Sequence, residues 1–234
     1  MIKQRGRQLR SLPRSFFSRD PRRVARELLG KLLIRSRGKK VLAGRIVEVE
    51  AYLGKGDPAA HAAAGMTARN RVLFGPPGHA YVYFIYGNHF CLNVSCQPKG
   101  EAGCVLIRAL EPLAGLKEMA QVRGLLRGAR LESFGGARLQ SCRSRIGEQA
   151  ALAAEVSLAE KRRLTTGPGR LSQAMGITRA RDNGKDLTSP RSGLWLAADG
   201  FRPRRIRRTP RIGIRKAATE KLRYILAGSE YVSG

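Results

Sequence analysis

The sequence predicts a single α+β domain, with a curved, mostly antiparallel β-sheet that is flanked by helices. Two observations support this fold class. Between residues 31 and 110, segments rich in Leu, Ile, Val and Tyr follow one another with short turn-forming links, as the strands of an antiparallel sheet do. Helix signals lie on both sides of this block, and 42% of the 234 residues are hydrophobic, which is enough to build one core.

The first predicted elements are a helix and a β-hairpin. The helix should begin after Asp20, a suitable N-cap that a proline follows at the first helical position, and it should stop at Gly30. Segments 31–35 and 41–52 are rich in Leu, Ile and Val and are joined by a turn-like stretch, so they predict the hairpin.

Three further strands are predicted at 81–86, 91–97 and 104–110. The links between them are short and contain Gly, Asn and Pro, so the three strands should form an antiparallel meander. The Glu111-Pro112 pair is expected to end the last strand, and a helix is expected from Leu113 to Val122.

The rest of the chain is less regular. Residues 124–164 are interpreted as an insertion or surface excursion within one domain that spans 1–234, with a helix expected over 148–162. Residues 1–14 are expected to form a basic, flexible tail, and Pro168 is expected to open a short helix. Three closing strands are predicted at 194–197, 211–215 and 222–226.

The charge of the chain points to a polyanionic partner. The 45 Lys and Arg against 17 Asp and Glu leave a net charge of +28. Fourteen basic residues lie within 1–40 and eight within 201–216, whereas the segment 41–98 is almost balanced. Cations at this density repel one another unless phosphates offset the repulsion, so nucleic acid is the first partner to consider. The alternative is that arginine acts only as a solubilising residue.

Several other classes of protein are disfavoured. The mean hydropathy is −0.30, and no apolar stretch approaches the ~18–20 residues that cross a bilayer, so no membrane association is expected. The basic N-terminus has no apolar stretch behind it, so we expect no secretory signal and a cytoplasmic location, at the nucleoid in a prokaryote or in the nucleus of a eukaryote. Walker, dinucleotide-binding and zinc-deaminase patterns are absent.

The cysteines do not have the spacing of a metal site. Cys91, Cys96, Cys104 and Cys142 lack the C-x₂₋₄-C pairs that bind zinc. We therefore expect buried free thiols, no metal and no organic cofactor.

Two carboxylates and one guanidinium stand out within apolar segments. Strict alternation along the strand 41–52 would place Ile46, Glu48, Glu50 and Tyr52 on one face. On a solvated edge strand such glutamates would be ordinary, but their neighbours here are strongly apolar. Arg108 also lies in an apolar strand and needs an anionic partner, for which Glu48 and Glu50 are the candidates. A purely structural ion pair is the alternative.

Aromatic and basic side chains accompany the carboxylates. Tyr81 and Tyr83 should share one face of their strand, with Tyr86 on the other face or at the strand end. Aromatic residues in strands are usually core residues, but three phenolic tips weigh against full burial of all of them. The preceding loop contains His61 and the Arg69-Asn70-Arg71 cluster, and a lone histidine is often structural.

Six motifs occur in order at consistent separations. They are Gly44–Gly54 (GRIVEVEAYLG), Ala59–His61 (AAH), Arg69–Arg71 (RNR), Tyr81–Gly87 (YVYFIYG), Cys91–Ser95 (CLNVS) and Val105–Pro112 (VLIRALEP). Together they resemble the alkyladenine (3-methyladenine) DNA glycosylase family, which are monofunctional enzymes of base-excision repair. The resemblance runs from residue 15 to residue 122 and resumes at 167–168 and 210–213.

The resemblance implies a mechanism of base flipping, in which the target nucleotide leaves the duplex and enters a pocket. It implies that Tyr86 wedges into the duplex, while Tyr52, His61 and Tyr83 line the pocket and stack on the extruded base. By the same resemblance, Asn93 excludes normal guanine through the exocyclic group of that base.

The resemblance also assigns the chemistry. It implies that Glu50 is the general base for a water aimed at C1′ of the sugar, as in inverting glycoside hydrolysis. Arg108 and the backbone carbonyl of Ile212 would help to hold that water, and Arg69 and Arg71 would contact DNA phosphates. The only lysine in the central motifs is Lys55, so hydrolysis without strand cleavage is expected.

The predicted function is therefore excision of alkylated purines, 3-methyladenine and 7-methylguanine, and of deaminated or etheno purines from double-stranded DNA by a monomer. A basic nucleic-acid-binding protein without catalysis is the alternative that the residues leave open. A formyltransferase-like small-molecule domain is a third class, whose own motif is missing here.

Overall fold

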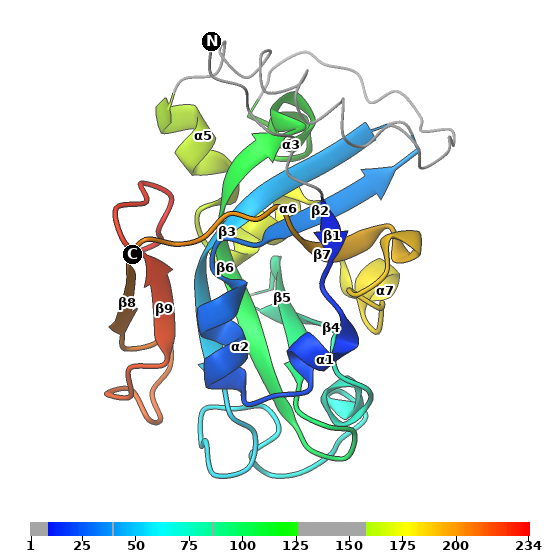
Figure 1. Cartoon of the computed structure of the whole chain (residues 1–234), viewed down its shortest axis with the longest axis vertical. Coiled ribbons are helices and arrows are strands. Elements are labelled where there is room, and N and C mark those ends of the chain that lie inside the picture. Colours follow the sequence, from blue (N-terminus) through cyan, green and yellow to red (C-terminus); the bar gives the residue numbers. More distant parts are fainter. Residues whose placement is uncertain (1–8, 39, 86, 126–157) are drawn as a thin grey trace.

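A computed structural model describes residues 9–38, 40–85, 87–125 and 158–234 of the chain (Figure 1). Within them the strands are β1 (Arg10–Ser11), β2 (Leu32–Arg37), β3 (Lys40–Tyr52), β4 (Ala80–Ile85), β5 (His89–Cys96), β6 (Gly103–Ala114), β7 (Leu194–Ala198), β8 (Ile206–Thr209) and β9 (Arg223–Leu226). The helices are α1 (Arg14–Phe17), α2 (Pro21–Leu28), α3 (Leu116–Val122), α5 (Leu158–Thr165), α6 (Pro168–Ala174) and α7 (Arg179–Asp182). Two 3₁₀ turns are η1 (Arg71–Phe74) and η4 (Pro190–Ser192).

The described strands form one open, largely antiparallel sheet, which confirms the predicted α+β fold class. Its order is β1-β7-β2-β3-β6-β5-β4, and the β8–β9 hairpin joins through pairing of β9 with β3. The long strands β3 and β6 cross the middle of the molecule, as Figure 1 shows. The predicted meander is confirmed as the consecutive neighbours β4, β5 and β6.

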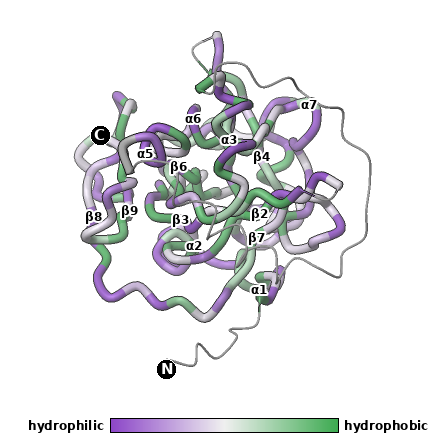
Figure 2. Tube along the Cα trace, turned by 90° about the horizontal axis from the view of Figure 1, so that it is seen from above, coloured by the Kyte–Doolittle hydropathy of each residue, from purple (hydrophilic) through white to green (hydrophobic). Residues whose placement is uncertain are grey.

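Helices cover both faces of the central strands. Figure 1 shows α2 in front of β3 and β6 and α6 behind them, and the view from above in Figure 2 places the two helices on opposite sides of the same strands. Val24 and Leu28 of α2 belong to the same buried cluster as Val49 and Ala51 of β3. Burial of these apolar side chains holds the helix on the sheet.

The helix α2 has the predicted boundaries. The Asp20 carboxylate accepts a hydrogen bond from the backbone N–H of Arg22 at 2.7 Å, which is the contact of an N-cap. Gly30 follows the helix with φ of +82° and donates its N–H to the carbonyl of Ile46 at 2.8 Å. The same glycine therefore ends α2 and starts the hairpin strand beside β3.

A local irregularity changes which residues of β3 share a face. The register between β3 and β6 shifts on both sides of Glu48, which leaves Val47 and Arg108 without partners in the ladder. The prediction that Ile46 faces the same way as Glu48 is wrong, because Ile46 packs in the core cluster with Ala51. The irregularity places Arg108 beside Glu48 on the opposite face.

Two element boundaries differ from the prediction near β6. The strand does not end at Glu111-Pro112 but continues to Ala114, and α3 begins at Leu116 rather than Leu113. Pro112 pairs with Gly44 next to a register shift, where a residue that lacks an N–H is tolerated. Gly115, with φ of +75°, separates the strand from the helix.

The predicted closing strand at 211–215 is also wrong. The second strand of this region is β8, and residues 211–215 form a loop after it. Pro210 has no N–H to donate to a ladder, and Gly213 has φ of +76°, so neither residue suits a continued strand. The loop instead carries Arg211 and Ile212 back towards β3.

The other predictions are partly covered by the structure. Within the predicted N-terminal tail, β1 pairs with β7, so residues 10–11 are part of the sheet. Of the predicted helix at 148–162, the described part falls in α5, and the remainder of the 124–164 segment lies largely outside the described residues. The helix opened by Pro168 and the strands at 194–197 and 222–226 are confirmed as α6, β7 and β9. No described helix is long and apolar enough to cross a bilayer.

We expect Gly54, which starts the loop after β3, to tolerate no side chain. Its φ is +82°, and a Cβ there would lie 1.6 Å from the carbonyl oxygen of Ala102. Gly56 has nearly the same φ, +84°, but open space around it. Gly56→Ala should therefore cost about 1–2 kcal/mol of unfolding free energy from the backbone alone, and Gly54→Ala about 1–3 kcal/mol more from overpacking. Urea denaturation of both variants measures this, and equal losses would contradict the assigned contact.

Candidate active site

A cavity of about 530 Å³ opens on the face of the sheet opposite α2. Its walls include Tyr52 of β3, Tyr83 of β4, Asn93 of β5 and Arg108 of β6, together with the start of α6. The alternate residues along these strands, such as Ala51, lie in the core beneath α2. The cavity has the size of a small-molecule site, for which about 300–1,000 Å³ is typical.

An aromatic cluster forms one wall of the cavity. The His61 ring lies edge-on to the Tyr83 ring, with centroids 4.6 Å apart and an interplanar angle of 67°. The Tyr81 hydroxyl lies 2.9 Å from Nδ1 of His61, which fixes the orientation of the imidazole. Arg69 lies over the Tyr83 ring at 5.6 Å. We call the part of the cavity that these side chains line the aromatic slot, and its aromatic surfaces suit a flat, electron-poor ring.

The environment of His61 favours its neutral form. Partial burial of the ring, and then the positive charge of Arg69, lower the pKa of His61 below its ordinary 6.5. Near pH 7 the imidazole therefore adds no positive charge to the cavity. One ring nitrogen of the neutral imidazole donates a hydrogen bond and the other accepts one. Nδ1 is the nitrogen that faces the Tyr81 hydroxyl.

Asn93 lies deeper in the same cavity. It is 1% exposed, and its Nδ2 donates to the carbonyl of Tyr81 at 3.2 Å. Its Oδ1 lies 3.8 Å from the thiol of Cys104. Burial raises the pKa of Cys104 to about 12, so this thiol stays protonated and is a poor nucleophile. The amide is thus held in one orientation against the cavity.

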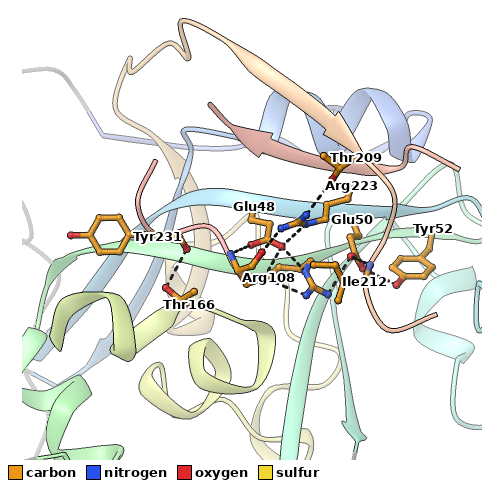
Figure 3. Close-up of polar contacts among 10 residues, drawn as sticks. Glu48, Glu50, Tyr52, Arg108, Thr166, Thr209, Ile212, Arg223 and Tyr231 are labelled. Carbon is orange, nitrogen blue, oxygen red and sulfur yellow. Dashed lines mark hydrogen bonds and ion pairs between the residues drawn. The ribbon is translucent and has the colours of Figure 1, made fainter. Parts of the chain in front are cut away.

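Glu50 lies directly behind the cavity wall and is completely buried. Its Oε2 accepts from the Tyr52 hydroxyl at 2.9 Å, and its Oε1 accepts from the backbone N–H of Ile212 at 2.8 Å (Figure 3). Nη1 of Arg108 lies 3.2 Å from the same Oε1. Because Tyr52, Arg108 and Ile212 all line the cavity, movement of any of them would expose the carboxylate to it.

Tyr52 is held on two sides. Burial, and then the negative charge of Glu50, raise the pKa of Tyr52, so the phenol stays protonated and donates to Glu50. The guanidinium of Arg211 lies over the Tyr52 ring at 4.7 Å. The Tyr52 ring therefore packs against the Arg211 guanidinium and also lines the cavity.

Arg211 and Asp57 join the two loops that flank Tyr52. The guanidinium donates to both oxygens of Asp57, at 2.6 and 2.9 Å, and to the carbonyl of Ala51 at 3.1 Å. Burial opposes ionisation of Asp57, but the bonds from Arg211 and from backbone N–H groups outweigh it and lower its pKa. Sequence reasoning missed both residues, because they are 154 positions apart and belong to no shared motif.

Glu48 is the second buried carboxylate and is also completely shielded from solvent. Nε of Arg108 and Nε of Arg223 each lie 2.7 Å from its Oε1 (Figure 3). The backbone N–H of Ser233 donates to Oε2 at 2.6 Å, and the Ser233 hydroxyl donates to Oε1 at 2.8 Å. Two arginines thus neutralise Glu48 and Glu50 together, and the C-terminal segment closes over the pair. Arg223 and Ser233 gave no signal in the sequence.

The family model of methylpurine-DNA glycosylases matches residues 15–230 of this chain. The chain belongs to the methylpurine-DNA glycosylase family. The predicted family and the predicted enzyme class, a DNA glycosylase, are therefore confirmed, and with them the role in DNA repair.

Curated relatives agree with this assignment. This glycosylase is 55% identical over 227 residues to a protein of Koribacter versatilis (strain Ellin345), covering 97% of this chain and 95% of the relative. It is 43% identical over 224 residues to a Burkholderia cenocepacia (strain HI2424) protein, covering 95% and 91%, and 42% identical over 229 residues to one of Methanoculleus marisnigri, covering 95% and 98%. All three bear the name "Putative 3-methyladenine DNA glycosylase".

The glycosylase brings most of the predicted site residues to one place. Five of them line the cavity together with Glu50 behind it, namely Tyr52, His61, Tyr83, Asn93 and Arg108. Arg69 also lines it, whereas Arg71 is exposed at the start of η1 and does not. Ile212 contacts Glu50 through its N–H, and its carbonyl has no observed role. Tyr86 lies outside the described residues.

The thiols of this glycosylase are as expected where they can be seen. Cys91, Cys96 and Cys104 are free and buried, and Cys142 lies outside the described residues. Among the described residues no group of His, Cys, Asp and Glu is arranged to hold a metal ion.

We expect Glu48→Gln to destabilise the glycosylase strongly. The change leaves Arg108 and Arg223 buried with one carboxylate in place of two, and breaking a buried pair costs about 3–5 kcal/mol. The matched control is Glu27→Gln, because Glu27 pairs with Arg19 and Arg23 while 41% exposed, and exposed pairs contribute only about 0–1 kcal/mol. Denaturant unfolding compares the two, and a loss at Glu48 no larger than at Glu27 would show that the cluster contributes little.

Proposed function

We propose that this glycosylase hydrolyses the N-glycosidic bond of alkylated purines, 3-methyladenine and 7-methylguanine, and of deaminated or etheno purines, after flipping them out of double-stranded DNA. One observation carries the proposal: an aromatic slot ends at a buried carboxylate that an arginine contacts. Tyr83 and His61 form the slot, and Glu50 with Arg108 lies at its end. A purine in the slot would place its sugar bond close to the carboxylate.

The slot suits damaged purines. Alkylation at N3 or N7 makes a purine cationic, and aromatic faces attract a cation by up to ~2 kcal/mol when water is excluded. The neutral state of His61 avoids repulsion of such a base. Asn93, which donates to the carbonyl of Tyr81, would exclude normal guanine through the exocyclic amino group of that base, as the family resemblance implies. These features favour selection by charge and shape.

The chemistry proposed for Glu50 is general-base catalysis. Glu50 would deprotonate a water that attacks C1′ while the purine leaves, as in inverting glycoside hydrolysis. In the free protein both of its oxygens accept protein donors. Glu50 is also completely buried, so water would reach it only when a wall residue such as Tyr52 or Ile212 moves aside.

Water is proposed as the only nucleophile. No lysine is among the described residues that line the cavity, and the Cys91 and Cys104 thiols have pKa values raised by burial. A Schiff base and the strand cleavage that follows it would need an amine at this place. We therefore propose a monofunctional hydrolase that needs no cofactor.

Contacts with the duplex complete the proposal. We propose that Tyr86 fills the space left by the flipped nucleotide and that Arg69 and Arg71 contact phosphates near the cavity mouth. A monomer is sufficient for this arrangement, because all the residues named for the site come from one chain.

The decisive experiment is release of free base from duplex DNA that contains 3-methyladenine or hypoxanthine. Wild-type protein should release the base, and Glu50→Gln should bind the same duplex but lose about 10²–10⁴-fold or more in rate, the usual size of a general-base contribution. Glu101→Gln serves as the control and should retain the wild-type rate, because Glu101 is exposed and does not line the cavity. Chromatography of the released base measures both.

The same assay tests the alternative function. A basic nucleic-acid-binding protein without catalysis would bind the duplex tightly and release no base, whether or not Glu50 is present. That outcome would overturn the proposed chemistry.

We expect protonation of His61 to make the binding of cationic bases, but not of neutral bases, depend on pH. Because the pKa of His61 is lowered, the ring gains its proton only as the pH falls below the ordinary 6.5. The resulting charge should weaken binding of 7-methylguanine duplex and leave binding of hypoxanthine duplex unaffected. The measurement is the Kd of both duplexes from pH 8 to pH 5 in the Glu50→Gln background, which should bind the duplexes without releasing the base. His61→Gln should remove the difference between the two bases, and an unchanged difference would exclude His61 as its source.

A further inference from the structure

A second, larger groove lies away from the base cavity. Its volume is about 840 Å³, and it runs between α2, the chain at 29–31, the connection at 201–203 and the β8–β9 hairpin. Residues of α2 line the groove, whereas the start of α6 lines the base cavity. Figure 1 shows these two helices on opposite sides of β3 and β6. The two sites have no lining residue in common.

The groove is strongly cationic. Its lining contains six basic side chains and one acidic side chain, Glu27; the basic ones are Arg22, Arg23, Arg26, Lys31, Arg202 and Arg208. Arg22 pairs with Asp20 and Arg23 with Glu27, both while exposed to solvent. Within the described part of the chain, Arg26, Lys31 and Arg202 have no carboxylate partner. The positive charges of these three side chains are therefore not neutralised by any described carboxylate.

The aromatic residues of the groove are not available for stacking. Arg45 covers the Phe201 ring at 4.2 Å, and Tyr224 is 3% exposed beneath Arg208, whose guanidinium lies 5.6 Å from the ring centroid. Proteins that bind single-stranded nucleic acid usually offer open aromatic faces to the bases. The groove is also lined by three apolar residues without an aromatic ring, Leu29, Pro203 and Ile206. Its exposed binding groups are therefore the cations, which favour contact with phosphates over stacking with bases.

The edge of the hairpin also disfavours an added peptide strand. In the described sheet β8 pairs with β9 alone, so its other side is an edge. Arg207 and Arg208 lie side by side in that short strand and are exposed. Charged residues on a short edge strand oppose strand addition. Arg208, which lines the groove, is nevertheless well placed to contact a phosphate backbone.

We propose that this groove binds the phosphodiester backbone of a second segment of double-stranded DNA while the first lies at the base cavity. The separation of the two sites on opposite faces of the sheet lets both be occupied at once. Binding through phosphates alone is independent of sequence and of damage. A chain that holds two segments can pass from one to the other without a free state in between, which would help it to search for rare lesions.

The test is the number of short undamaged duplexes that one chain binds. Duplexes of about 12 base pairs, just over one helical turn, are short enough that one cannot reach both faces. Sedimentation at low salt should show two duplexes per wild-type chain and one per Arg26→Gln/Arg202→Gln chain. The affinity of the second duplex should fall by about 60-fold at about 0.1 M salt and its salt slope by about 1.8, as expected for two lost phosphate contacts.

The control is Lys99→Gln/Arg191→Gln, which removes two exposed cations that line neither site. It should retain two duplexes. Equal behaviour of the two double variants would overturn the proposal, and so would tighter binding at the groove of single-stranded DNA or of an acidic peptide than of duplex. Base release is measured separately, so a failure of the proposed catalysis and a failure of the second site give different results.

Discussion

The active-site region depends on the neutralisation of two buried glutamates by two buried arginines. Glu48 and Glu50 are both completely shielded from solvent, and Arg108 contacts both of them. Arg223 adds the second positive charge through Glu48. An isolated charge in such a place would cost several kcal/mol, so each of these residues is tolerated only because the others are present. The register shifts around Glu48 make the arrangement possible, because they place Arg108 next to the carboxylates.

Within the same cluster the Glu50 carboxylate is ionically paired and shielded from the cavity by wall residues. Its two oxygens are occupied by the Tyr52 hydroxyl and the Ile212 N–H, which belong to the cavity wall. Arg211 and Asp57 in turn tie the loop that carries Ile212 to the loop that carries His61. A ligand that enters the aromatic slot thus meets groups that are connected to the carboxylate. Occupancy of the slot and exposure of the Glu50 carboxylate are therefore physically linked through these contacts.

The sequence predicted the parts of the molecule that depend on local patterns. The N-cap at Asp20 and the meander follow from capping, alternation and turn signals. The cluster of Tyr52, His61, Tyr83 and Asn93 was implied by the family resemblance of the motifs that contain them. The parts that failed depend on contacts across the fold. Strict alternation could not foresee the register shifts beside Glu48, and an apolar pattern at 211–215 could not show that this segment turns back to the cavity.

The partners of Glu48 were missed for the same reason. Ser233 lies 185 positions from Glu48, and its role is carried by a backbone N–H and a hydroxyl, which have no distinctive pattern in a sequence. Arg223 was one arginine among many in a basic segment. The charge composition indicates a polyanionic partner. It does not distinguish arginines that face solvent from arginines that neutralise buried carboxylates.

The dependence of Glu48 on Arg223 and Ser233 has a consequence for biosynthesis. A ribosome completes β3 and β6 long before it adds the residues that neutralise and cover their buried carboxylates. Until then the nascent chain lacks the partners that neutralise and cover Glu48, so the buried cluster can close only after residue 233 has been added.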